Sequence, residues 1–162
     1  MLGLLKQIRK MRFLVLVFVI VFVEFGAFSQ SIFDGEIAEI QANSAEKNLE
    51  APVIFIGSSS IRMWKTLEMD FSSFPVLNHG FGGSEYSDLL VFQQQLIGDF
   101  EPSMIVVYAG DNDIANGENP EAIAEEASHF VDGLRRLANE SLVIILSTKP
   151  SPARWELKEE FV

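Results

Sequence analysis

Four short runs of almost continuous apolar residues constrain the fold of this chain more than any other feature. They occupy residues 52–57, 74–80, 103–110 and 141–148. A strand covered on both faces needs apolar side chains at nearly every position, whereas a strand with one solvent face alternates between apolar and polar residues. The runs therefore predict parallel strands that lie buried between layers of helices.

Helical stretches separate these runs. Residues 87–100 are long enough for a helix, and residues 120–140 place apolar side chains along one face at helical spacing. Strands that alternate with helices predict a doubly wound α/β sheet. Residues 33–50 predict a short helix or an ordered arm. Because only four strands precede a last helix-like stretch at 153–162, we expect the fold to be incomplete at its C-terminus.

The first 29 residues have the order of a secretory signal peptide. Basic residues within the first twelve positions precede an apolar run at 13–23, and Ala27 and Ser29 follow at the spacing of a cleavage site. That run is shorter than the roughly 20 residues that span a bilayer. We predict a signal peptide over residues 1–29, a domain over residues 30–162, and secretion or a bacterial periplasmic location. An uncleaved anchor is the alternative.

The domain left after cleavage is strongly acidic and has no cysteine. Residues 30–162 carry 8 basic and 22 acidic side chains, which gives a formal net charge of −14. Such a surface disfavours nucleic acid and anionic membranes as partners. Disulfides cannot stabilise this domain, so its core must hold it together.

Polar and glycine-rich segments follow the first three predicted strands. They are residues 57–60 (GSSS), 78–84 (NHGFGGS) and 110–113 (GDND). The carboxyl ends of parallel strands share one edge of the sheet, where ligands bind in such folds. A serine there is a nucleophile if a base removes its proton, and glycine N–H and asparagine amide groups can stabilise an oxyanion. No phosphate-loop, G-x-S-x-G or HExxH motif is present.

The segments GSSSIRMW, NHGFGGS and YAGDND resemble the first three sequence blocks of the SGNH hydrolases, also called GDSL-type esterases. The resemblance covers about residues 34–158 and includes the segment STKPSPARW after the fourth run. It implies a flavodoxin-like three-layer α/β/α fold with a parallel sheet. It also implies Ser59 as the nucleophile, with Ser58 where the family usually has aspartate, and Gly83 and Asn112 as oxyanion-hole donors. The alternative is that the three serines merely cap the following helix.

The family's catalytic base is a histidine in an Asp-x-x-His block, and this block is absent. The chain has two histidines, His79 beside the second loop and His129 within a predicted helix. Neither lies in an Asp-x-x-His frame, so we expect the catalytic Asp and His beyond Val162 and predict that these 162 residues alone are inactive. A makeshift base at His79 remains a minor alternative.

Several other residues allow two interpretations. Asp111 and Asp113 flank Asn112, where they either fix the loop by backbone hydrogen bonds or hold a divalent cation. Two Arg–Trp groupings either line a substrate pocket or pack against helices. They are Arg62 with Trp64 and Arg154 with Trp155.

The predicted function is an exported serine esterase that hydrolyses O-acyl esters, such as acetylated carbohydrates or lipid acyl esters. A non-catalytic exported domain that binds carbohydrate or ester on the same fold is the main alternative, and a flavodoxin-like phosphate or flavin binder is a third. We expect a small-molecule or polysaccharide ester as partner, no nucleic acid, no stable membrane span, no cofactor and no metal. The sequence does not fix the oligomeric state.

Overall fold

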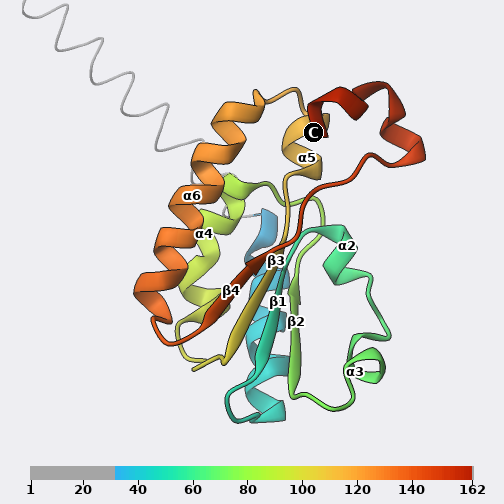
Figure 1. Ribbon diagram of the computed structural model, residues 1–162. Helices are drawn as coiled ribbons and strands as arrows, with labels where there is room; N and C mark the ends of the chain where they lie inside the picture. The colour runs from blue at the N-terminus through green and yellow to red at the C-terminus, as the bar shows by residue number, and fades with distance from the viewer. Residues whose placement is uncertain (1–31, 162) are drawn as a thin grey trace, which may run out of the picture. The chain divides into compact units, whose positions relative to one another are not determined.

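A computed structural model describes residues 32–161 of the chain, so the predicted signal peptide lies outside the described residues. A helix over residues 32–47 comes first. The remaining elements follow in the order β1 (Val53–Gly57), α2 (Ser59–Arg62), α3 (Leu67–Asp70), β2 (Val76–Gly80), α4 (Tyr86–Ile97), β3 (Met104–Tyr108), α5 (Asp111–Ala115), α6 (Pro120–Leu137), β4 (Leu142–Ile145) and the 3-10 helix η1 (Pro152–Phe161) (Figure 1).

The four strands form one parallel sheet in the order β2-β1-β3-β4. In its centre, Ile54 of β1 pairs with Leu77 of β2 and with Ile105 of β3. This order confirms the predicted doubly wound sheet, because the chain starts near the middle and extends to both sides. Residues from Glu36 onward form one compact unit, which contains the whole sheet.

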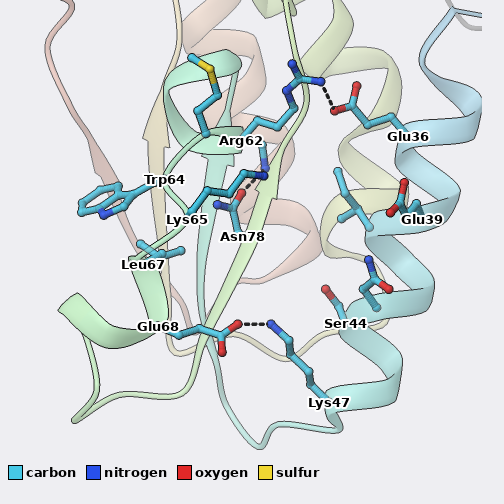
Figure 2. Close-up of a pocket in the computed structure, with 14 residues that line it drawn as sticks. Glu36, Glu39, Ser44, Lys47, Arg62, Trp64, Lys65, Leu67, Glu68 and Asn78 are labelled. Carbon is cyan, nitrogen blue, oxygen red and sulfur yellow. Dashed lines mark hydrogen bonds and ion pairs between the residues drawn. The ribbon is translucent and has the colours of Figure 1, made fainter.

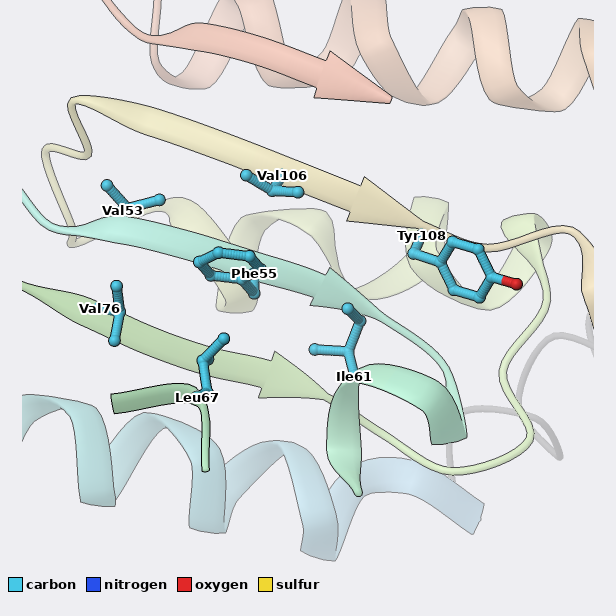
Figure 3. Close-up of a cluster of buried hydrophobic side chains, with 7 residues drawn as sticks. All are labelled: Val53, Phe55, Ile61, Leu67, Val76, Val106 and Tyr108. Carbon is cyan, nitrogen blue, oxygen red and sulfur yellow. The ribbon is translucent and has the colours of Figure 1, made fainter. Parts of the chain in front are cut away.

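Helices cover the two faces of the sheet, which confirms the three-layer prediction (Figure 1). On one face lie α2 and α3, which contribute Ile61 and Leu67 to a cluster around Phe55 (Figure 3). On the other face, α4 packs against α6, and the carbonyl of Leu96 in α4 accepts a hydrogen bond from the His79 ring of β2. Successive side chains of each strand point to opposite faces, so every strand contributes to both layers.

The fourth strand departs from the sequence-based prediction. We expected β4 to be buried on both faces, but Leu142 is 57% and Ile145 48% exposed. The expectation was wrong because β4 is an edge strand, paired only with β3, and no further described element covers it. An apolar groove of about 340 Å³ lies beside it, lined by side chains that include Val106, Ile144 and Leu146.

The helix boundaries agree with the local sequence signals. The Asn119 side chain accepts the N–H of Glu121 at 2.8 Å and caps α6. The predicted helix at 87–100 is α4, which begins with a capping box formed by Glu85 and Asp88 and ends before Gly98. The helix-like C-terminal stretch is 3-10 helical but kinked at Arg154, whose φ of −128° and ψ of 29° are not helical. Between residues 32 and 161, no helix combines the length and hydrophobicity that a membrane crossing requires.

Candidate active site

The first loop begins at Gly57, the last residue of β1. Its φ is +155°, and a Cβ there would lie 2.0 Å from the carbonyl oxygen of Tyr108. Only glycine fits so close to the neighbouring strand. The chain turns at the buried Ser58, and the partly exposed Ser59 is the first residue of α2. The predicted nucleophile therefore lies at the carboxyl edge of the sheet.

The three serines do not cap α2 through their side chains. Ser58 occupies the N-cap position but makes no side-chain cap bond. Its backbone carbonyl instead accepts the N–H groups of Ile61 and Arg62, each at 3.1 Å. Ser60 is exposed. The capping alternative is thus wrong, because the backbone alone begins this short helix.

The second loop is tied to the first by backbone and side-chain bonds. The N–H of Phe81 donates to the carbonyl of Gly57 at 3.0 Å. Asn78 bridges the two segments, since its amide donates to the Ile61 carbonyl at 2.7 Å and its side-chain oxygen accepts the N–H of Gly80 at 3.0 Å. Gly83 is exposed at the apex of the loop with φ +82°, in the left-handed region that favours glycine.

The third loop meets the second through Asn112, in the first turn of α5. Its Nδ2 donates to the carbonyl of Ser84 at 3.0 Å, and its Oδ1 accepts Nη2 of Arg154 at 3.1 Å. Because arginine can only donate, it fixes the amide oxygen on its own side and directs the NH₂ group toward the second loop. One of the two amide hydrogens bonds Ser84, which leaves the other for a ligand.

Arg154 fixes this loop in a second way. Its Nη1 donates to the backbone carbonyl of Asp111 at 2.6 Å, so one guanidinium holds two adjacent residues of the loop. The Asp111 carboxylate accepts the hydroxyl of Tyr108 at 2.9 Å. Burial and, to a smaller extent, this carboxylate raise the pKa of Tyr108 to about 12, so the phenol stays protonated and keeps donating. Arg154 therefore holds the third loop through two hydrogen bonds, a role that neither sequence interpretation included.

Backbone donors at the same edge are uncommitted. Among residues 32–161, no hydrogen bond uses the N–H of Ser59 or of Gly83. Together with the second amide hydrogen of Asn112, they are the three donors that the resemblance assigns to an oxyanion hole. Preformed N–H groups of this kind stabilise negative charge without reorganisation. The three predicted site residues therefore lie on loops that contact one another, with donors available.

Neither histidine is placed as a general base. His79 is fully buried on the α4 face of the sheet, where Nδ1 donates to the Leu96 carbonyl and Nε2 accepts the Ser44 hydroxyl, both at 2.8 Å. Burial lowers the pKa of His79 to about 4, so the ring is neutral and both nitrogens are occupied. His129 is exposed on α6. No interaction between described residues joins either histidine to Ser59.

A charged cleft of about 630 Å³ lies between residues 36–47 and the α2–α3 segment (Figure 2). An ion pair between Arg62 and Glu36, with Nη1 and Oε1 3.3 Å apart, and a second pair between Lys47 and Glu68 cross it. Trp64 also borders the cleft, but its ring packs against Phe55 and Phe71, with centroids 5.8 and 5.6 Å away, as the packing interpretation expects. None of the three predicted site residues lines it. We therefore interpret this cleft as a groove beside the candidate active site.

Several solved structures have a fold similar to that of this chain. The chain is similar to a Streptococcus pneumonia protein provisionally named a platelet activating factor (20% identity, TM-score 0.62, 75% of this chain and 58% of that one). It is also similar to a GDSL-like lipase from Bacteroides thetaiotaomicron (21%, 0.59, 76% and 66%) and to AlinE4, an SGNH-hydrolase family esterase (19%, 0.57, 70% and 68%). No family model matches the sequence. No curated protein matches it either.

The chain therefore has the α/β/α fold that these solved structures share. It spans 58% of the Streptococcus pneumonia protein and 66% of the Bacteroides lipase. The roles of Ser59, Gly83 and Asn112 stay predictions.

Proposed function

We propose that this chain carries the nucleophile and the oxyanion hole of an exported serine esterase that hydrolyses O-acyl esters. One observation carries the proposal. Asn112 is held by Ser84 on one side and by Arg154 on the other, so its amide NH₂ is presented at the loop cluster that contains Ser59. A structural loop has no need to fix an asparagine amide while leaving one of its hydrogens uncommitted.

In the proposed reaction, the Ser59 hydroxyl oxygen attacks the ester carbonyl carbon while a base takes the hydroxyl proton. The carbonyl oxygen becomes an oxyanion, which accepts hydrogen bonds from the N–H groups of Ser59 and Gly83 and from the Asn112 amide. Collapse of this intermediate expels the alcohol, to which the base returns the proton. Water then hydrolyses the acyl-enzyme by the same steps in reverse order.

The proposed reaction needs a base, and these 162 residues contain no Asp-x-x-His block to supply one. His79 is sealed between Ser44 and Leu96, and His129 has no contact with the loops. Glycine and amide donors alone support only slow acylation, because the serine hydroxyl stays protonated at neutral pH. We therefore expect the chain to have a formed oxyanion hole and a weakly reactive serine.

A fluorophosphonate probe tests the proposal, because it phosphonylates activated serines. The 162-residue chain and the full gene product are treated with probe, with and without imidazole as a substitute base, and the labelled peptide is identified by mass spectrometry. We expect fast labelling of Ser59 in the full product and slow, imidazole-stimulated labelling in the 162-residue chain. Ser59→Ala should abolish it, whereas the matched control Ser60→Ala should retain it. Labelling that survives Ser59→Ala would refute the assignment.

The second candidate is a non-catalytic exported domain that binds carbohydrate or ester through the same loops. The placement of both histidines away from Ser59 favours it. The two candidates differ in the full gene product. A folded full product that binds an acetylated oligosaccharide, yet never labels at Ser59, would establish the binding domain and exclude the esterase.

A further inference from the structure

Three carboxylates from separate segments converge beside the third loop. Asp113 lies in α5, Glu118 in the α5–α6 connection and Glu126 in α6. Each offers an oxygen, and these oxygens all lie within 4.8 Å of one another. The backbone N–H of Glu118 donates to the carbonyl of Asp113 at 3.0 Å, which folds the connection back over α5. This backbone bond holds Glu118 close to Asp113.

Two of the carboxylates have buried oxygens without a partner. Asp113 is fully buried, and its Oδ1 accepts the N–H of Tyr86 at 2.9 Å. Its Oδ2 has no hydrogen-bond partner among the described residues, and the same is true of Oε2 of Glu126. A buried carboxylate oxygen without a partner is costly to desolvate unless a proton or a cation satisfies it. Two such oxygens in one cluster indicate a missing positive charge.

The surrounding negative charges make a positive charge at this cluster still more favourable. Burial first, and then the neighbouring carboxylates, raise the pKa of Glu126, and the nearby acidic groups include Glu85 and Asp88. His129, exposed one turn further along α6, has the opposite effect on it. No lysine or arginine forms an ion pair with this cluster within the described part of the chain.

We propose that Asp113, Glu118 and Glu126 bind one calcium ion. All three ligands are carboxylate oxygens, which hard cations prefer, and the cluster contains no cysteine or histidine that would favour a softer metal. Calcium–oxygen bonds of about 2.4 Å span about 4.8 Å across the ion, which the spacing of these oxygens fits. Glu118 and Glu126 are only partly buried, so water can enter from their side and complete the coordination.

The ion would join elements that carry the candidate active site. Asp113 follows Asn112 directly, and through Tyr86 it also contacts the first turn of α4. Calcium would thus fix α5 against α6 and α4 and hold the loop that presents the Asn112 amide. The calcium site does not depend on the esterase proposal, because it is defined by carboxylates that have no part in the reaction.

Calorimetric titration of calcium chloride into the chelator-treated 162-residue chain tests the site, with magnesium chloride titrated in parallel. We expect one calcium ion per chain with a Kd on the order of 10⁻⁴ M, weaker magnesium binding, and a rise in Tm of roughly 5–10 °C at a hundredfold excess over Kd. Glu126→Gln and Glu118→Gln should each weaken binding by about tenfold or more. Glu125→Gln, an exposed neighbour on α6, is the matched control and should change it less than about twofold.

Asp113→Asn adds an independent variant, because its side-chain oxygen can still accept the Tyr86 N–H. It should fold and lose calcium binding. Three results would overturn the site: no heat and no change in Tm up to about 10 mM calcium, equal weakening by Glu125→Gln and Glu126→Gln, or a Glu126→Gln chain that is more stable without metal while the native chain binds none. The last result would show that the carboxylates share a proton.

Discussion

His79 should make the protein less stable as the pH falls from about 6.5 to about 4. In the folded chain its pKa is about 4, against an ordinary value of 6.5, because the ring is buried. Below pH 6.5 the unfolded chain binds a proton at this site, whereas the folded chain stays neutral until the pH nears 4. The unfolded state therefore gains free energy on acidification, and stability that is fully present above pH 6.5 is lost as the pH falls.

The size of this effect follows from the two pKa values. Between about pH 7.5 and about pH 4.5, a shift from 6.5 to about 4 removes about 2.5 kcal/mol from the free energy of unfolding. Domains of this size are stable by only about 5–15 kcal/mol, so the loss is easily measured. The carboxylates Asp113 and Glu126 change stability in the opposite direction, since their pKa values are raised. The contribution of His79 to the pH dependence of stability must therefore be obtained by comparing the native chain with variants.

We would measure this contribution by urea unfolding at both pH values, comparing the native chain with His79→Gln and His129→Gln. His79→Gln should be less stable at neutral pH, because glutamine fits the site between Ser44 and Leu96 less well, but it should lose about 2.5 kcal/mol less on acidification than the native chain. His129→Gln is the matched control on an exposed histidine and should follow the native chain. An unchanged pH dependence in His79→Gln, or the same change in His129→Gln, would refute the reasoning.

Two further substitutions test the loops. Gly57→Ala should destabilise the chain by about 3 kcal/mol or more in urea unfolding, because its Cβ would lie 2.0 Å from the Tyr108 carbonyl oxygen and the strand pair must separate; a loss below about 1 kcal/mol would contradict this reading. Arg154→Lys should leave Tm unchanged but slow imidazole-stimulated labelling of Ser59 by about tenfold or more, because lysine cannot hold both the Asp111 carbonyl and the Asn112 amide. Unaltered labelling would show that Arg154 does not position the amide.

The positions of the strands were predictable because a run of apolar residues indicates a segment that avoids water. All four predicted strands form, each shorter than the predicted run. The exposure of β4 was not predictable in the same way. An apolar run such as 141–148 shows that a segment avoids water, but it does not show whether a neighbouring element covers it. The helix at 32–47 also resolves a choice that sparse apolar spacing had left open.

The site was predictable where it depends on the backbone and unpredictable where it depends on side-chain contacts across the fold. Parallel strands bring their carboxyl ends to one edge, so Ser59, Gly83 and Asn112 were expected on neighbouring loops. The bond from Arg154 to Asn112 joins residues 42 positions apart, and no local sequence pattern predicts it. The only available signal was the resemblance of the STKPSPARW segment to the family. The calcium-ligand cluster was missed for the same reason, although Asp113 had been considered as a cation ligand with Asp111.

These two kinds of contact give the site two levels of rigidity. The first and second loops are fixed by strand register and by the Phe81–Gly57 bond, in the best covered part of the sheet. The Asn112 amide instead depends on Arg154, which lies in η1 beyond β4, the least covered strand. Local opening is easiest where few apolar contacts are buried, so release of β4 and η1 would free the amide while Ser59 keeps its position. Any partner or chain segment that covers the apolar groove beside β4 should therefore tighten the oxyanion donor without contacting it.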